Sequence, residues 1–202
     1  IFINKALLDY AGTSGNLAVS AYGIINRTTM FFVMIVFGVT QGMQPILGFN
    51  YGANKWDRVK RTLSIGIWLG VAITTVGFAV TELFPDTISA MFTNDETLIG
   101  IAREGFRIYF IVYPVVGCQI VIQNFFQSIG KPKLSIFLSL TRQLLFLIPF
   151  LIILPRHFGT DGVWASMCGS DLLAAIVAAA TVLVMIKRLN KRFATLSPIN
   201  QN

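Results

Sequence analysis

Charged residues are scarce in this sequence, because Asp, Glu, Lys and Arg together make up only 12% of its 202 residues. An ordinary water-soluble domain carries about 25%. Cysteine and histidine are rarer still, with two cysteines and one histidine, which excludes a disulfide scaffold and leaves little room for a His-based metal site. The motifs GxSxG, HExxH, CxxC and the Walker A loop do not occur, so we expect no enzyme, no cofactor and no direct drive by ATP.

Hydrophobic residues, in contrast, make up 54% of the chain, which excludes a disordered protein. A helix needs about 20 mostly apolar residues to cross a bilayer, and five stretches are long enough: 17–49, 59–84, 98–126, 134–154 and 163–186. Clusters of Gly, Pro, Asn and Asp separate them and favour chain reversals. The sequence therefore predicts an all-α polytopic membrane helix bundle with five crossings in a lipid bilayer, preceded at 1–11 by the end of another helix.

The basic residues lie in alternate loops. The loops after the first and third stretches and the tail after the fifth carry Lys55, Arg58, Lys60, Arg61, Lys131, Lys133, Lys187, Arg188, Lys191 and Arg192. The loops at 12–16 and 85–97 carry no Lys or Arg, and the loop at 155–162 carries only Arg156. Cationic loops stay in the cytoplasm, so we expect a cytoplasmic C-terminus. The net charge of +7 then reflects membrane topology, and we expect no nucleic-acid partner.

The end of the first stretch contains the most informative motif. Pro45 removes a backbone hydrogen-bond donor and predicts a kink or hinge, and Asn50, Gly52 and Asn54 suit a tight exit into the basic loop. A plain Pro-kinked helix end would look the same on physical grounds alone.

The residues of this motif resemble those of the multidrug and toxic compound extrusion (MATE) transporters. Each lobe of that family tends to carry a Gly-x-x-Gln-x-x-x-Pro-like helix end followed by an Asn-x-Gly-Ala loop. The matching residues here are Gly38, Gln41, Gln44, Pro45, Asn50, Tyr51, Gly52 and Ala53. The form QPILGFNYGA is most similar to the bacterial branch with the DinF-like and MepA-like exporters, and AYGIINR at 21–27 and FFQSIGKPK at 125–133 support the match.

The resemblance implies that residues 1–202 form the C-terminal transmembrane lobe of such a transporter, from the end of helix seven through helices eight to twelve. The N-terminal lobe would be its partner. The resemblance also implies H⁺- or Na⁺-coupled antiport of small organic, often cationic, compounds across the bacterial inner membrane by alternating access.

The site of the coupling ion is expected outside this sequence. The Na⁺-type branch carries an acidic residue on helix ten, but the stretch at 106–127 contains none. The DinF-like branch places its carboxylate on the first helix, in the N-terminal lobe. Two alternatives stay open: a flippase for lipid-linked oligosaccharides with similar architecture, and a membrane scaffold without transport.

Polar and aromatic side chains form faces within two of the stretches. At 100° per residue, one stripe of the first stretch contains Asn26, Met30, Gln41 and Gln44, and a sector of the third contains Tyr109, Tyr113, Gln123 and Asn124. Aromatic, Met and amide groups suit a cavity for apolar cations, with Arg142 as a further candidate. Hydrogen bonds between helices would explain the same amides.

Three ionisable residues lie deep in the stretches. Arg27 is about 15 Å from the outer end of its stretch, and Arg142 and Asp171 are about 15 Å from the turns before theirs, at 1.5 Å per residue. A charge at this depth needs a partner or a water-filled cavity. We expect Asp171 to pair with Arg142 or Arg27, and the alternative is that Asp171 titrates during proton coupling.

Overall fold

The computed structural model describes residues 2–196, and the side chains of all of these except Thr13 and residues 191–196. The predicted tail cations Lys191 and Arg192 therefore lie outside the described side chains. The elements in chain order are α1 (Phe2–Tyr10), the short 3₁₀ turn η1 (Gly12–Ser14), α2 (Gly15–Gly52), α3 (Trp56–Leu83), α4 (Pro85–Ala90), α5 (Glu96–Phe110), α6 (Tyr113–Ser128), α7 (Pro132–Leu140), the π-helical segment η2 (Thr141–Leu147) and α8 (Ile148–Leu196).

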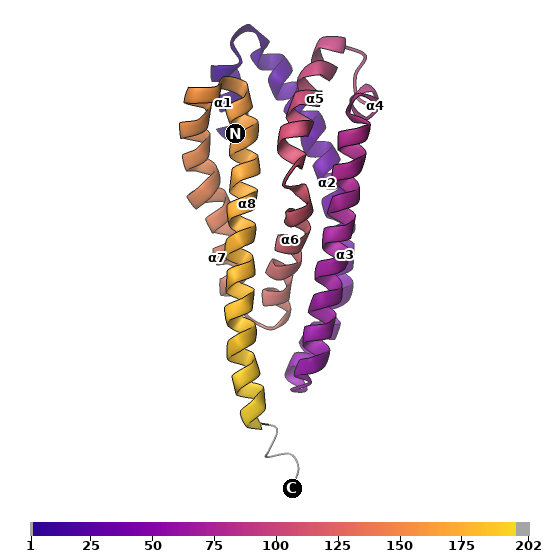
Figure 1. The fold of residues 1–202 in the computed structure, drawn as a ribbon, viewed down its shortest axis with the longest axis vertical. Coiled ribbons are helices and arrows are strands. Elements are labelled where there is room, and N and C mark those ends of the chain that lie inside the picture. The colour runs from indigo at the N-terminus through magenta and orange to yellow at the C-terminus, as the bar shows by residue number, and fades with distance from the viewer. Residues whose placement is uncertain (1, 197–202) are drawn as a thin grey trace.

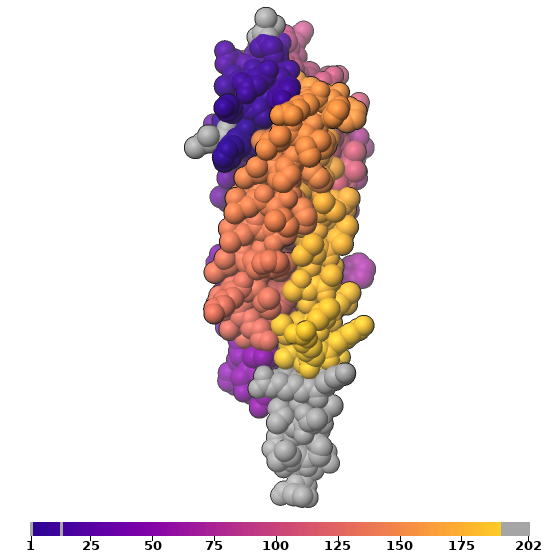
Figure 2. Space-filling model, turned by 90° about the vertical axis from the view of Figure 1, so that its left-hand side faces the viewer, coloured from indigo at the N-terminus to yellow at the C-terminus, as the bar shows by residue number. Residues whose placement is uncertain are grey.

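The long helices run up and down along one axis (Figure 1). The helices α2 and α3 and the stretch Pro132–Asn190 are each long and apolar enough to cross a membrane, and α5 and α6 reach this length and hydropathy only as a bent pair. The short helix α1 packs against α2 and α8 near one end of the bundle (Figure 2). An all-α membrane bundle is therefore confirmed.

The third predicted crossing is not one straight helix. It is divided into α5 and α6, which meet at an angle of 57°. Pro114 is the second residue of α6. It cannot donate a backbone hydrogen bond, and it disfavours the helical conformation of the residue before it. The helix over the stretch 98–126 is therefore interrupted at residues 111–112.

The stretch Pro132–Asn190 contains two crossings that fold back on each other. Gly159 lies in the left-handed region of φ (φ 56°, ψ −131°), which interrupts α8 and reverses the chain. On either side of this turn, the Ser166 hydroxyl donates to the Phe150 carbonyl at 2.9 Å. A contact between residues so placed requires two antiparallel arms, and Figure 1 shows them. Helices therefore cover all five predicted stretches.

The interior of the bundle is closely packed, and the outside is apolar. The backbones of α3 and α6 approach each other at Gly70 and Gly117, where a Cβ added to Gly117 would lie 2.2 Å from the Gly70 carbonyl oxygen. The Thr74 hydroxyl donates to the Pro114 carbonyl at 3.0 Å across the same contact. Large apolar side chains such as Trp68, which is 74% exposed, cover the outer surface, as a lipid-facing surface requires.

The basic loops gather at one end of the molecule. The turn between α2 and α3, the turn between α6 and α7, and the C-terminal part of α8 all lie there (Figure 1). The Trp56 indole donates to the Asn190 side-chain oxygen, and this bond ties the start of α3 to α8. The Lys131 ammonium contacts the Met185 sulfur at 3.4 Å.

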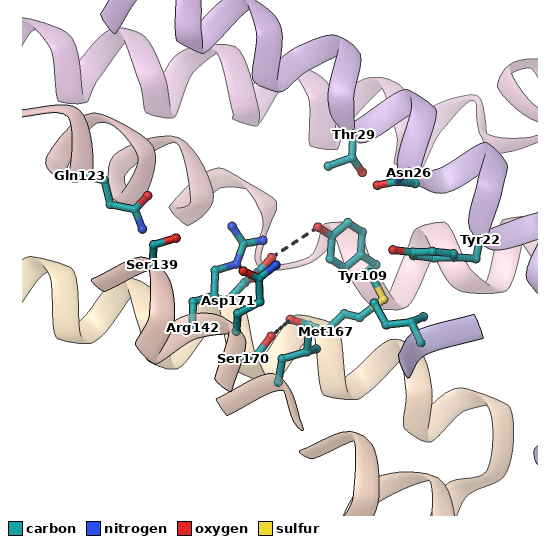
Figure 3. A pocket seen from close by; sticks show the side chains of 13 residues that line it. Tyr22, Asn26, Thr29, Tyr109, Gln123, Ser139, Arg142, Met167, Ser170 and Asp171 are labelled. Carbon is teal, nitrogen blue, oxygen red and sulfur yellow. Dashed lines mark hydrogen bonds and ion pairs between the residues drawn. The ribbon is translucent and has the colours of Figure 1, made fainter. Parts of the chain in front are cut away.

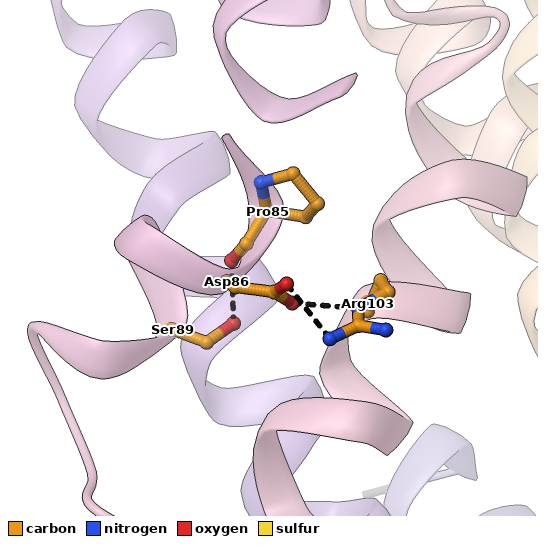
Figure 4. A network of polar contacts seen from close by, with 4 residues as sticks. All are labelled: Pro85, Asp86, Ser89 and Arg103. Carbon is orange, nitrogen blue, oxygen red and sulfur yellow. Dashed lines mark hydrogen bonds and ion pairs between the residues drawn. The ribbon is translucent and has the colours of Figure 1, made fainter. Parts of the chain in front are cut away.

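The opposite end carries an exposed ion pair between α4 and α5 (Figure 4). The Arg103 guanidinium donates to both carboxylate oxygens of Asp86, from Nε at 2.6 Å and from Nη2 at 2.7 Å. The Ser89 hydroxyl donates to the Pro85 carbonyl at 2.9 Å within α4. This two-pronged geometry uses both oxygens of Asp86.

Candidate functional site

A polar cavity of about 310 Å³ lies among the helices. Side chains from α1, α2, α5, α6, α7, η2 and α8 line it, and Figure 3 shows them converging from these elements. The lining residues are Ile3, Tyr22, Asn26, Thr29, Tyr109, Gln123, Ser139, Arg142, Gln143, Leu147, Met167, Ser170 and Asp171.

The cavity wall contains a buried ion pair. Arg142 Nε lies 2.6 Å from Asp171 Oδ1, and the Tyr109 hydroxyl donates to Asp171 Oδ2 over a longer 3.4 Å. The two side chains differ in exposure, because Arg142 is 36% exposed and Asp171 only 4%. Arg142 lies in the π-helical segment η2 and lines the cavity. Such π-helical turns occur frequently at functional sites.

Of the two partners expected for Asp171, the structure selects Arg142. Arg27 is exposed on α2, so it is not part of a buried charge cluster. The physical reason is the helix period: Asn26 points into the cavity, and the next residue is turned about 100° away from it.

The structure brings together some of the predicted cavity residues. Asn26, Tyr109, Gln123 and Arg142 line the cavity. Tyr113 and Asn124 do not: the buried Tyr113 hydroxyl donates to the Thr29 carbonyl at 2.9 Å, and the Asn124 amide donates back to Ile120 at 3.0 Å. The Tyr113 bond joins two helices, as the alternative of hydrogen bonds between helices supposed, whereas the Asn124 bond stays within α6.

The remaining candidates on α2 lie outside this cavity. Met30, Gln41 and Gln44 are exposed on the surface of the bundle, and their place in a larger cavity between two lobes stays a prediction.

Sequence reasoning missed several lining residues, although a signal for them existed. Three short stripes at helical spacing face the cavity: Tyr22–Asn26–Thr29 on α2, Ser139–Arg142–Gln143 at α7 and η2, and Met167–Ser170–Asp171 on α8. Each stripe follows the i, i+3, i+4 or i+7 pattern of one helix face. Searching the neighbours of each buried charge for this pattern would have found Gln143 and Ser170.

The motif at the end of α2 forms a cap. The helix continues through Pro45 to Gly52, so a hinge at Pro45 stays a prediction. The Asn50 amide donates to the Ile46 carbonyl at 2.8 Å, and the Asn50 carbonyl accepts from the Lys55 amide at 2.9 Å. The left-handed residue of the turn is Asn54, with φ 58°, one of the three residues expected to suit this exit.

Among the described residues, no group of three or more His, Cys, Asp or Glu side chains could hold a metal ion. The cavity instead offers amides, hydroxyls, two tyrosine rings and one guanidinium. These groups can bind an organic molecule by hydrogen bonds and ring contacts, without covalent chemistry.

Known proteins share this fold. A multidrug resistance MATE family transporter of the MOP superfamily, solved in an inward-facing conformation, superposes with a TM-score of 0.85 at 22% identity, over 94% of this chain and 44% of that one. The MATE multidrug transporter DinF-BH gives a TM-score of 0.74 at 38% identity, over 80% of this chain and 36% of that one.

The matching sequences define the same class. The MatE family model matches residues 6–153, and the chain belongs to this family of membrane transporters. Multidrug export protein MepA from Staphylococcus saprophyticus is 23% identical over 189 residues, which are 94% of this chain and 41% of MepA. The chain therefore spans less than half the length of this curated relative.

Proposed function

We propose that this chain forms one lobe of a multidrug efflux transporter in the bacterial inner membrane. The observation that carries the proposal is the polar cavity of about 310 Å³ inside a membrane bundle of the MatE family. The side-chain amides of Asn26, Gln123 and Gln143 line this cavity and make no hydrogen bond to any described residue. Unused donors and acceptors at this depth are suited to a polar ligand or water.

The lobe would work with an N-terminal lobe by alternating access, in which two lobes rock about a site between them. The share of MepA that the chain spans, 41%, supports this division. We propose that H⁺ or Na⁺ drives export and that its site lies in the N-terminal lobe. Both oxygens of Asp171 are engaged here by Arg142 and Tyr109, which supports a structural role for this carboxylate.

The cargo of the proposed transporter is a small organic molecule with cationic character. The rings of Tyr22 and Tyr109 border the cavity (Figure 3), and aromatic faces attract cations within about 6 Å of the ring centre. The end of the bundle that carries the basic loops would face the cytoplasm, together with the C-terminus.

The two alternatives are less well supported. A flippase for lipid-linked oligosaccharides would need a strongly basic cavity, but Arg142 is the one cation among the described lining residues. A scaffold would use its amides in bonds between helices. Tyr113 and Asn124 do use their polar groups within the bundle, but the three free amides of the cavity do not.

Accessibility labelling tests the proposed function. Gln123→Cys is introduced into the full-length chain after Cys118 and Cys168, both half-buried, are replaced by Ala. A transporter should change the labelling rate several-fold when the ion gradient is reversed. Glu96→Cys, at the exposed start of α5, is the control and should label equally in both conditions. A rate at position 123 that is independent of the gradient would favour the scaffold.

A further inference from the structure

Arg142 uses only part of its hydrogen-bonding capacity. A guanidinium has five N–H donors, and Nε is the atom that contacts Asp171, at 2.6 Å. The four donors of Nη1 and Nη2 make no hydrogen bond within the described part of the chain. The exposed ion pair between α4 and α5 has a different geometry, because Arg103 donates to both oxygens of Asp86, from Nε and from Nη2.

The Arg142–Asp171 pair presents its positive member to the cavity. Arg142 is 36% exposed and Asp171 4%, so a ligand in the cavity meets the guanidinium, with the carboxylate behind it. Figure 3 shows Arg142 projecting into the space bordered by Tyr109, Asn26 and Gln123. Among the described lining residues, no other charged side chain is present. The cavity is therefore neutral in sum, but its accessible charge is positive.

A free guanidinium edge has a defined chemical preference. Its two parallel N–H groups match the two oxygens of a carboxylate, and such bidentate bonds are among the strongest in proteins. Away from bulk water the attraction is stronger, because the surroundings screen it less. The free amides of Gln123 and Gln143 can donate to the same anion. A purely cationic cargo would instead face a like charge at this wall.

We propose that the Nη edge of Arg142 is a subsite for a carboxylate of the cargo. This inference rests on the proposed function and narrows it: the preferred substrates are zwitterions that carry a carboxylate beside their cationic or aromatic part. Asp171 is a positioning residue that holds the guanidinium from behind. The apolar part of the cargo has room in an adjoining groove of about 410 Å³, which shares Tyr22, Gln143 and Leu147 with the cavity.

Equilibrium binding of a matched pair of dyes tests the proposal. The probes are a rhodamine with a free carboxylate and the ethyl ester of the same dye, measured by fluorescence anisotropy on the full-length protein in detergent. The double variant Arg142→Gln/Asp171→Asn removes both charges, so it leaves no unpaired ion in the bundle. It should weaken binding of the carboxylate dye by about tenfold or more, and that of the ester by less than about threefold.

The single variant Asp171→Asn separates two models, one in which Arg142 binds the cargo and one in which Asp171 binds it. The two models predict changes in dye affinity of opposite sign. If Arg142 binds the cargo, removal of the negative charge that offsets the guanidinium should strengthen binding of the carboxylate dye several-fold. If Asp171 itself binds cations, this variant should weaken the ester dye instead, and that result would overturn the proposal. The matched control is Arg103→Gln/Asp86→Asn, an ion pair outside the cavity, which should leave both affinities unchanged.

Export of the two dyes from cells distinguishes a failure of the proposed efflux function from a failure of the carboxylate subsite. If cells that express the wild-type transporter export neither dye, the proposed efflux function fails. If both dyes are exported but the double variant weakens them equally or not at all, the carboxylate subsite fails and the efflux function stands.

Discussion

At the scale of single residues, the main polar feature of the cavity is the ion pair between Arg142 and the buried Asp171. A carboxylate in a membrane bundle is costly unless it is paired or hydrated, and Asp171 has Arg142 at 2.6 Å as well as the Tyr109 hydroxyl. The pair therefore holds η2 against the last arm of α8. It also gives the cavity its accessible positive charge, so the same contact serves packing and recognition.

Removing one partner of this pair should destabilise the protein more than removing both. Arg142→Ala leaves a carboxylate buried alone, and we expect a loss of about 2–3 kcal/mol in the free energy of unfolding, less than for a fully buried pair because Arg142 is partly exposed. The double variant Arg142→Met/Asp171→Leu, in which no ion remains, should recover most of this loss. Thermal unfolding in detergent measures both. Equal losses in the two variants would show that the pair does not act as a unit.

Asp171→Asn separates the structural role of this carboxylate from a role in ion coupling. We expect export of the ester dye to continue, with a lower temperature of unfolding, because one member of the pair has lost its charge. Export in cells and thermal unfolding of the purified variant are the two measurements. Loss of export at unchanged stability would instead assign the coupling ion to Asp171.

At the scale of the helices, close backbone contacts decide how the elements pack. The contact of α3 with α6 depends on Gly70 and Gly117, since no side chain separates the two backbones there. The bend between α5 and α6 follows directly from Pro114, and the reversal within α8 follows from the left-handed Gly159. Each of these features is local in sequence, but each sets the relative position of whole crossings.

Substituting Gly117 tests this packing. In Gly117→Ala, the added methyl would meet the Gly70 carbonyl oxygen at 2.2 Å, so the two helices must move apart. We expect a loss of about 1–3 kcal/mol in stability, seen as a lower temperature of unfolding. Gly42→Ala is the matched control, because nothing lies within 4 Å of the added methyl, and it should leave stability nearly unchanged. A tolerated Gly117→Ala would contradict the close contact of α3 and α6.

At the scale of the whole molecule, charge is separated along the long axis. The turn with Lys131 and Lys133 lies at the same end as the start of α3 and the end of α8 (Figure 1), and the bond from Trp56 to Asn190 joins the latter two. The turn that contains Asp95 and Glu96 lies at the other end. A bundle with this asymmetry has one favoured orientation in a membrane.

This orientation can be measured with an impermeant thiol reagent. Lys133→Cys should react in inverted membrane vesicles and stay unreacted in intact cells, because cationic turns remain in the cytoplasm. Asp95→Cys should show the reverse. Both side chains are exposed, so access to solvent is not limiting. Reaction of both positions from the same side would overturn the proposed topology.

The sequence alone determined the helical class, the apolar stretches and their order, the family resemblance and the clustering of basic loops. These properties depend on the length and period of local patterns, which are visible in one chain. It also narrowed the partners of Asp171 to two arginines. The tertiary structure decided between them. It also showed that Asn26, Gln123 and Gln143 line a cavity, while the polar groups of Tyr113 and Asn124 are hydrogen-bonded within the bundle. These outcomes depend on the rotation and register of helices that are distant in sequence, and no local pattern encodes these.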